Sequence, residues 1–384
     1  MAEGRQVVII GAGVIGCSVA FHLARMGQRG VCVLERERLP GSGSTSRANG
    51  GIRAQFATEV NLRMSLLSMR ILDELAGEIG DPPVYRKAGY LFVTGNPQRL
   101  QEMATAVEVQ RARGVTVELL DADGVHATAP FVAEPVLGGT FGARDGFIDP
   151  GGLTNFFLRE AARTGIEVRY LAGVTAIHRE RSGDLTVRTT AGDLTAPVVV
   201  NAAGPYARGV AAMLGVDLPV EPVRRHLVVS GPCRALPAVI PMTIDADSGV
   251  LIRREGERVL IAYADPNEPA GFNTDFDPDF PEKIADAVEA RFPVVAAAGI
   301  DLRRSWAGLY EVTPDHHAVL GEVPGHPGLL LANGFSGHGV MHAPAAGRAI
   351  AELIVRGRCE SVDIRPLEIG RFARGELLHE KMVL

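Results

Sequence analysis

The sequence predicts an α/β protein, and three observations support that prediction. A short apolar run at residues 7–10 precedes a glycine-rich turn, a helical pattern and a second apolar run that ends at Glu35. A second strand, glycine loop and helix follow at residues 329–355. Between the two units, strands alternate with helices instead of forming one all-β or all-α block. This alternation is typical of sheets that are covered by helices.

The first unit reads as a dinucleotide-binding motif, Gly11-x-Gly13-x-x-Gly16. The first glycine permits a tight turn, the second lets the backbone approach a pyrophosphate, and the third lets the helix pack on the strand. The helix N-terminus attracts phosphates, and Glu35 can accept hydrogen bonds from a ribose. A carboxylate there repels a 2′-phosphate and disfavours NADP. The unit alone leaves NAD and FAD open, as well as a plain glycine-rich turn.

Composition excludes several classes of function. The 384 residues are enough for two domains, and 46% of them are apolar. The net charge of −6 and the lack of a basic tract give nucleic-acid binding little support. The four cysteines form no CxxC pair, which favours a reducing, cytoplasmic setting. No signal peptide or membrane span is expected.

The next segments are predicted in chain order. The Gly/Ser-rich stretch 41–51 is either a flexible linker or a loop that wraps a second phosphate and a ring system. Its position directly after Glu35, together with Arg47 and Arg53, favours the loop. A helix is expected at 58–80 with a stop at Asp81-Pro82-Pro83. The following ranges are predicted as strand 89–94, helix 97–113, strand 115–119, turn-rich strand 138–150, helix 153–163, meander 174–195 and strand 198–201.

The last third continues in the same way. Strands alternate with turns over 220–264, and a polar-faced helix covers 281–291. The loop 333–339 then leads into a helix from about Pro344 to Val355. The free amides at the start of that unit can donate hydrogen bonds to a negatively charged group.

Together the motifs resemble the D-amino-acid oxidase superfamily of flavoproteins. The matching stretches are IIGAGVIG with Glu35, GSGSTSRANGGIR, DGFIDP, VVNAAGPYA, WAGLYEVTPD and GFSGHGVMHAP. Within the superfamily, the chain is similar to the β subunits of sarcosine oxidase and L-proline dehydrogenase. The resemblance implies FAD, and a Rossmann-like FAD-binding domain of the glutathione-reductase type (1–81, 147–216 and 323–384). It also implies an interleaved substrate-binding domain (82–146 and 217–322) on a mixed antiparallel sheet.

The motifs and the resemblance assign a set of residues to the cofactor. They are Gly11, Gly13, Val14, Ile15, Gly16, Glu35, Arg36, Ser44, Thr45, Ser46, Arg47, Asn49, Gly50, Gly51, Val174, Ala202, Ala203, Gly204, Gly308, Tyr310, Gly334, Phe335, Ser336, Gly337, His338, Gly339, Val340 and Met341.

Departures from the family pattern predict that FAD is bound without a covalent link. Monomeric sarcosine oxidase attaches its flavin to a cysteine where this chain has Gly308. Sarcosine and dimethylglycine dehydrogenases use a histidine in the Gly/Ser loop, where this chain has Arg47. No histidine lies near Ile148–Asp149, the region used by the sarcosine oxidase β subunit. The lysine that holds the substrate carboxylate in monomeric oxidases is replaced by Met341.

Three residues are expected at the catalytic site: Arg53, Tyr310 and His338. Arg53 is the expected carboxylate anchor, because a guanidinium forks onto a carboxylate, although a surface arginine is the alternative. Tyr310 is either a pocket residue or an ordinary core tyrosine. His226 and His338 are candidates for polar contacts, although lone histidines are often structural. No metal is expected, since no thiolate or acid completes the histidine group.

The predicted function is oxidation of a small amino acid by hydride transfer to FAD. A secondary amine such as sarcosine, proline or another N-alkyl amino acid is favoured. The alternatives are glycine, a D-amino acid, a 2-hydroxy acid, or a flavoprotein assembly factor without catalysis. No lysine falls between Lys87 and Lys283, which favours a dehydrogenase or a slow oxidase. A second subunit or an electron-acceptor protein is a possible partner.

Overall fold

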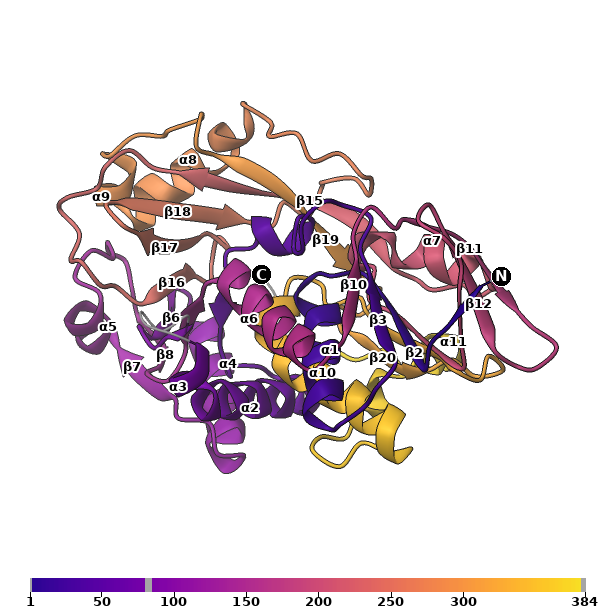
Figure 1. Cartoon of the computed structure of the whole chain (residues 1–384). Helices are drawn as coiled ribbons and strands as arrows, with labels where there is room; N and C mark the ends of the chain where they lie inside the picture. Colours follow the sequence, from indigo (N-terminus) through magenta and orange to yellow (C-terminus); the bar gives the residue numbers. More distant parts are fainter. Residues whose placement is uncertain (1, 80–84, 381–384) are drawn as a thin grey trace.

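We describe residues 2–79 and 85–380 of a computed structural model, in which the strands form four sheets (Figure 1). The predicted helix stop at Asp81-Pro82-Pro83 lies outside the described residues. Two of the sheets are large and flank the functional site. None of the helices in the described ranges combines the length and the hydropathy that crossing a bilayer requires.

The first large sheet brings together strands from the start, the middle and the end of the chain. Its strand order is β10 (Glu167–Arg169), β3 (Val31–Leu34), β2 (Val7–Ile10), β14 (Val198–Asn201), β21 (Leu329–Asn333) and β20 (Val319–Glu322). All neighbours run parallel except β20, which pairs antiparallel with β21. All four residues of β2 are buried, as expected for a parallel strand covered on both faces.

Helices cover one face of this sheet, and smaller elements cover the other. The helical layer consists of α1 (Val14–Arg25), α10 (Gly339–Arg356), α6 (Pro150–Arg163) and α2 (Glu59–Glu74). α1 and α10 approach closely because small residues face each other. Ser18 Oγ donates to the carbonyl of Ala343 at 2.7 Å, and a Cβ at Gly347 would lie 2.2 Å from Ser18 Oγ. The two predicted strand–glycine–helix units are therefore packed directly together.

The opposite face carries α7 (Ala207–Ala212) and a four-stranded sheet. Its order is β1 (Glu3–Gly4), β13 (Leu194–Ala196), β12 (Leu185–Thr189) and β11 (Val174–Arg179). A small third sheet joins β4 (Gly51–Ile52), β9 (Gly146–Ile148) and β5 (Tyr85–Arg86).

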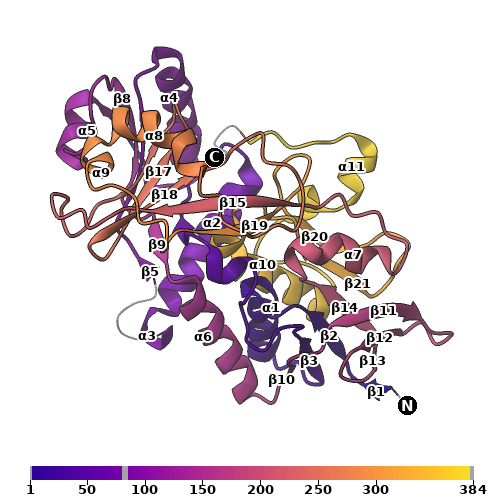
Figure 2. The ribbon, with the colours of Figure 1, turned by 90° about the horizontal axis from the view of Figure 1, so that it is seen from above.

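The second large sheet has eight strands and stands beside the first (Figure 2). Its order is β19 (Trp306–Val312), β15 (Glu221–Val229), β18 (Arg258–Tyr263), β17 (Leu251–Glu255), β16 (Met242–Asp245), β6 (Tyr90–Thr94), β8 (Gly138–Gly142) and β7 (Glu118–Asp121). Only β16 and β6 run parallel, so the sheet is mixed and mainly antiparallel. The predicted fold class is confirmed, while the exact domain limits stay a prediction.

Element ends differ from the prediction at several places. The helix expected at 58–80 is divided at Leu75 into α2 (Glu59–Glu74) and α3 (Ala76–Ile79). α10 begins at Gly339, not near Pro344, which lies inside the helix. A proline in the second turn removes one hydrogen bond close to the helix start, and the packing against α1 tolerates it. α6 begins at Pro150 because Asp149 caps it, accepting from the amide of Gly151 at 3.0 Å. β7 begins at Glu118, three residues later than expected.

The remaining helices lie around the two large sheets. They are α3 (Ala76–Ile79), α4 (Pro97–Ala112), α5 (Ala122–Thr128), α8 (Phe280–Arg291), α9 (Pro293–Ala296), α11 (Gly370–Arg374) and the 3₁₀ turns η1 (Ser44–Arg47), η2 (Gly204–Tyr206) and η3 (Arg365–Leu367).

Candidate active site

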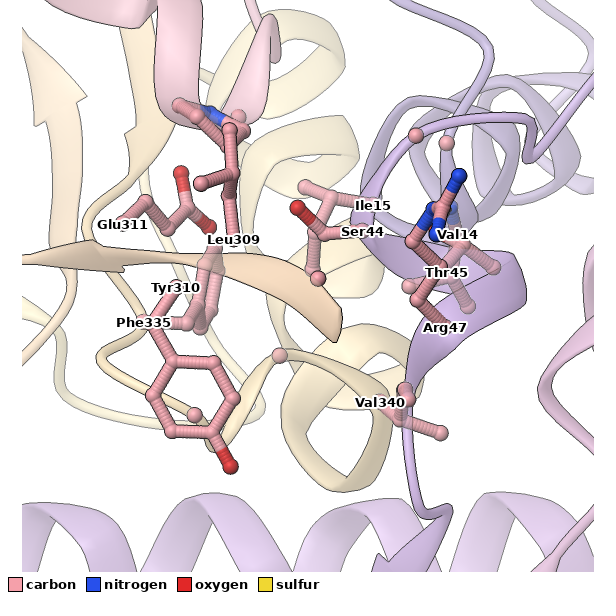
Figure 3. A pocket seen from close by; sticks show the side chains of 18 of the residues that line it. Val14, Ile15, Ser44, Thr45, Arg47, Leu309, Tyr310, Glu311, Phe335 and Val340 are labelled. Atoms are coloured by element: carbon pink, nitrogen blue, oxygen red, sulfur yellow. Dashed lines mark hydrogen bonds between the residues drawn. The ribbon is translucent and has the colours of Figure 1, made fainter. Parts of the chain in front are cut away.

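A cavity of about 810 Å³ is lined by elements of both large sheets. Its walls include both glycine units, the Gly/Ser loop, the end of β14 and strands of the eight-stranded sheet. Figure 3 shows Tyr310 and Glu311 on one side, and Thr45 and Arg47 on the other. A single cavity therefore joins the dinucleotide motif to the predicted substrate side.

The first glycine unit forms a cradle in which Gly11 and Gly16 leave no room for a side chain. Gly11 has a φ of +107°, and a Cβ there would lie 2.4 Å from the carbonyl oxygen of Ala202. No side chain caps the start of α1, although the amide of Val14 donates to Thr45 Oγ1 at 3.1 Å. The helix thus directs its positive end and its uncapped first turn toward the cavity, which suits a phosphate.

Glu35 lies at the end of β3 beside this cradle. Its Oε2 accepts from the amide of Ala12, and its Oε1 accepts from the amide of Glu37, both at 2.9 Å. These bonds fix the carboxylate at the cavity wall. Each oxygen keeps a second lone pair for a ribose hydroxyl.

The Gly/Ser loop is folded against the cavity and is not an extended linker. Residues 44–47 form the turn η1, and Gly50, with a φ of +78°, would place a Cβ 2.2 Å from the carbonyl of Ile148. Ser44 Oγ and Asn49 Oδ1 are buried, line the cavity, and have no hydrogen-bond partner among the described residues. Buried polar atoms without partners are costly. These two atoms fit a polar cofactor such as FAD.

Arg47 fills the space beside Gly308. Arg47 Nη1 donates to the carbonyl of Ala307 at 2.8 Å, and Trp306 Nε1 donates to the carbonyl of Arg47 at 3.1 Å. A Cβ at Gly308 would lie 2.8 Å from the Cβ of Arg47. Neither position offers a thiol or an imidazole to the cavity.

The second glycine loop meets Tyr310. Gly337 has a φ of +94°, and a Cβ there would lie 2.4 Å from Tyr310 Cε2. Since α10 starts at Gly339, its first turn contains Gly339, Val340 and Met341, all of which line the cavity. No side chain caps this helix start either.

Arg53 is almost fully buried, with only 1% of its surface exposed, so the surface interpretation was wrong. Its guanidinium lies 4.0 Å from the ring centre of Phe56, and Nη1 donates to the carbonyl of Gln55. His338 stands edge-on to the same ring, with the centroids 5.1 Å apart. Burial, and next the charge of Arg53, hold the pKa of His338 well below its usual value, so this imidazole is neutral.

Glu311 is a buried carboxyl group that the motifs had not singled out. Its Oε2 has no partner among the described residues, and its side chain lines the cavity. Burial raises the pKa of Glu311 to about 7, although the amides of Gly334 and Phe335 oppose the rise. No spacing signal marks this residue, because its burial depends on the loop that folds over β19.

The eight-stranded sheet supplies further wall residues that the sequence did not reveal. They are Tyr90, Arg225, Leu227, Met242, Leu251, Ala262 and Tyr263. His226, a candidate for a polar contact, also lines the cavity, but its ring stacks on Phe280 with ring centres 4.1 Å apart. Its Nε2 accepts from the amide of Asp277, so the imidazole is structural.

Most of the residues expected at the cofactor line the cavity, with three exceptions: Gly16, Ser46 and Gly334. Gly16 acts in packing, since a Cβ there would lie 1.9 Å from the carbonyl of Gly11. Ser46 Oγ turns back to the carbonyl of Gly43 at 3.1 Å. A Cβ at Gly334 would meet Thr313 Cγ2 at 2.4 Å, so this glycine serves loop packing. No metal-binding group of histidines, cysteines or acids occurs in the described ranges.

Comparisons with known proteins agree with this geometry. Residues 6–353 match the DAO family, described as FAD dependent oxidoreductase. The chain is 32% identical to FAD-dependent oxidoreductase domain-containing protein 1 of Xenopus laevis, covering all of this chain and 85% of that protein. It is 30% identical to human mitochondrial sarcosine dehydrogenase, covering 98% of this chain but 42% of that protein.

Among solved structures, L-proline dehydrogenase from P. horikoshii superimposes with a TM-score of 0.91 at 28% identity. The superposition covers 98% of this chain and all of that one.

Proposed function

This chain belongs to the DAO family of FAD-dependent oxidoreductases, and from that premise we propose that it oxidises a small secondary-amine amino acid. Sarcosine, proline and other N-alkyl amino acids form this class. The observation that carries the proposal is the continuous cavity, which links a phosphate cradle at α1 to Arg53 and Tyr310. Names of similar proteins, sarcosine dehydrogenase and L-proline dehydrogenase, support the substrate class.

In this proposal the cradle holds FAD without a covalent bond. The helix starts of α1 and α10, Glu35, Ser44 and Asn49 offer hydrogen-bond partners along the cavity. A flavin held there would supply the hydride acceptor for oxidation at the α-carbon of the substrate. Gly308 and Arg47 offer no nucleophile for a covalent link.

The side chains of this protein orient the substrate and exclude water. Arg53 is a cation in a site that excludes bulk solvent, where its attraction for a carboxylate is strong. Tyr310 packs on the second glycine loop and closes the wall on that side. His338 stays neutral, and so adds no positive charge that would repel a substrate amine.

The electron acceptor is proposed to be a partner and not oxygen. Neither Lys87 nor Lys283 lines the cavity, and each pairs with an aspartate, Lys283 Nζ with Asp265 Oδ2 at 2.7 Å. In some oxidases of this family, an active-site lysine is expected to activate oxygen for its reaction with the reduced flavin. Slow reoxidation of the reduced flavin by air is therefore expected, and rapid reoxidation would contradict this part of the proposal.

Anaerobic reduction of the purified flavoprotein tests the proposal. Sarcosine, proline, glycine, a D-amino acid and a 2-hydroxy acid are each added, and bleaching of the flavin absorbance is timed. Secondary amines should bleach fastest. If only glycine, D-amino acids or hydroxy acids act, the substrate class is wrong. If only a co-purified complex turns over, the chain works as one subunit of a larger enzyme.

We also propose that the protein works in a reducing compartment such as the cytoplasm, because all four cysteines are unpaired. Several similar proteins carry the word mitochondrial in their names.

A further inference from the structure

Glu311 lies near the end of β19, where the loop before α10 folds over the strand. Side chains alternate along a strand, so Glu311 points away from the face that carries Tyr310 and toward this loop. The amide of Ser336 donates to the carbonyl oxygen of Glu311 at 3.1 Å. The amide of Thr313 in turn donates to Ser336 Oγ at 3.2 Å. The loop therefore fixes the backbone that carries Glu311.

The carboxyl group of Glu311 keeps hydrogen-bonding capacity that the protein does not use. The residue lines the cavity and part of its surface is accessible there. Its Oε2 is nevertheless buried and has no partner among the residues that the structure describes. Figure 3 shows Glu311 on the wall opposite Thr45 and Arg47, in the Gly/Ser loop. A cofactor held between these walls therefore meets the carboxyl group.

Charged and titratable side chains on the elements around Glu311 are occupied elsewhere or neutral. They are Glu221, Arg224 and Arg225 on β15, Arg47 on η1, Tyr206 on η2, His338 before α10, Tyr310 on β19 and Asp315 just after it. The ion pairs among them are Glu221 with Arg208, Arg224 with Glu268, and Asp315 with Arg371.

The other members of this set do not offset a charge on Glu311 either. Arg47 and Arg225 donate to backbone carbonyls. Burial raises the pKa of Tyr310 and lowers that of His338, so both stay neutral. Burial and two backbone amides, without a charged side chain, account for the raised pKa of Glu311.

The chemistry of FAD favours the neutral form of this carboxyl group. FAD carries an anionic pyrophosphate, and it displaces water from the cavity that it fills. Both effects disfavour a carboxylate and raise its pKa further. A protonated carboxyl group supplies one O–H donor, and a carboxylic acid kept neutral at pH 7 can use it to hold a ligand. The phosphates, hydroxyls and ring of FAD all carry acceptor atoms.

We infer that Glu311 is protonated when FAD is bound and donates a hydrogen bond to it, so that FAD binding is coupled to the uptake of a proton from solvent. The neutral acid binds FAD tightly and the carboxylate binds it weakly. The inference concerns how the cofactor is held, and so it is independent of the substrate class. Its dissociation test rests on the proposed non-covalent attachment of FAD.

The first test measures the Kd of FAD between pH 6 and 8.5. The holoprotein is diluted at each pH, and the fluorescence of released FAD is followed to equilibrium. With a pKa of about 7 in the cofactor-free protein, the Kd of the wild type should rise about 30-fold over this range. In Glu311→Gln it should stay within about threefold of the wild-type value at pH 6, because a carboxamide donates at every pH.

Glu221→Gln is the matched control. Glu221 lies on the neighbouring strand β15, pairs with the exposed Arg208 and does not line the cavity. This variant should keep the full pH dependence of the wild type. Any pH dependence that all three proteins share belongs to other groups.

The second test needs no dissociation of the cofactor. At pH 8.5 the infrared difference spectrum of the wild-type holoprotein against Glu311→Gln should contain the carbonyl stretch of a neutral carboxyl group. This arm also separates two failures. Flavin that stays with acid-precipitated protein refutes the proposed non-covalent attachment, while the infrared band still reports on Glu311.

Three results would overturn the inference. The first is an equal pH dependence of the Kd in the wild type and Glu311→Gln. The second is a Kd at pH 6 that is more than about tenfold higher in Glu311→Gln, since an acceptor and not a donor would then be needed. The third is a holoprotein without the neutral carboxyl band, which also decides the question if Glu311→Gln holds no FAD.

Discussion

The ring of Tyr310 rests directly on Gly337, so that a single added methyl group at position 337 would overlap Tyr310 Cε2 at 2.4 Å. Tyr310 belongs to the eight-stranded sheet, whereas Gly337 belongs to the loop that opens α10. This contact fixes the wall of the cavity where the two large sheets meet.

Gly337→Ala is expected to weaken FAD binding. The substitution adds a Cβ at a φ of +94° and displaces Tyr310. Left-handed strain of about 1–2 kcal/mol, together with the clash, corresponds to a Kd about 10-fold higher or more. Titration of the apoprotein with FAD measures the change. Gly357→Ala is the control, because it carries a similar backbone strain at a φ of +72° but lies away from the cavity, with no atom within 4 Å of its Cβ.

Acid precipitation should release the flavin into the supernatant. The side chain of Arg47 occupies the place beside Gly308, and neither residue can form a thioether or an imidazole link. Gly308→Cys should displace Arg47 and lower the flavin content. Flavin absorbance that stays with the precipitated wild-type protein would contradict this prediction.

Glu311 is expected to make the apoprotein less stable as pH rises. Its pKa is raised to about 7 in the folded state, above that of an exposed glutamate. Between about pH 4.5 and 7 the folded state keeps a proton that the unfolded state has lost, so the free energy of unfolding falls. The loss of unfolding free energy over this range is about 3 kcal/mol. Urea unfolding of wild type and Glu311→Gln across this range should show the difference, and parallel curves would rule it out.

His342 is expected to make the folded protein less stable as pH falls, which is the opposite of the pH dependence expected from Glu311. Burial lowers its pKa to about 3, and its Nε2 lies 3.0 Å from Ser65 Oγ. Below about pH 6.5 the imidazole of His342 binds a proton in the unfolded state but not in the folded state. Stability is therefore lost as pH falls, by up to ~1.4 kcal/mol per pH unit. In His342→Gln, the slope of the unfolding free energy against pH should decrease in the acid range. The decrease should correspond to up to one bound proton.

Arg371→Met should be strongly destabilising. Arg371 Nε and Nη2 bond both oxygens of Asp315 at 2.7 and 2.9 Å, and the side chains are 2% and 0% exposed. Removing one partner leaves a buried charge, at a cost of about 3–5 kcal/mol in urea unfolding. Arg374→Met, which removes an exposed pair with Glu368, should cost less than ~1 kcal/mol. Equal losses in the two variants would contradict the prediction.

The sequence predicted the parts of the site whose geometry is local. Gly11, Gly13 and Glu35 lie in one strand–helix–strand unit, so their spacing alone brings them together. Arg225 and Met242 were not predicted, because their common face depends on the register of β15 to β18 and β16 to β6. The burial of Arg53 also depends on distant residues, since Phe92 comes from another sheet.

The order of strands in the six-stranded sheet also has a consequence for folding. β2 pairs with β14, which lies about half a chain away, and β14 then pairs with β21 near residue 330. During synthesis β2 can pair early with β3, but its other neighbour, β14, is made much later. Contacts of such long sequence separation form slowly and leave strand edges open to aggregation. We therefore expect a newly synthesised chain to bind its cofactor late in folding.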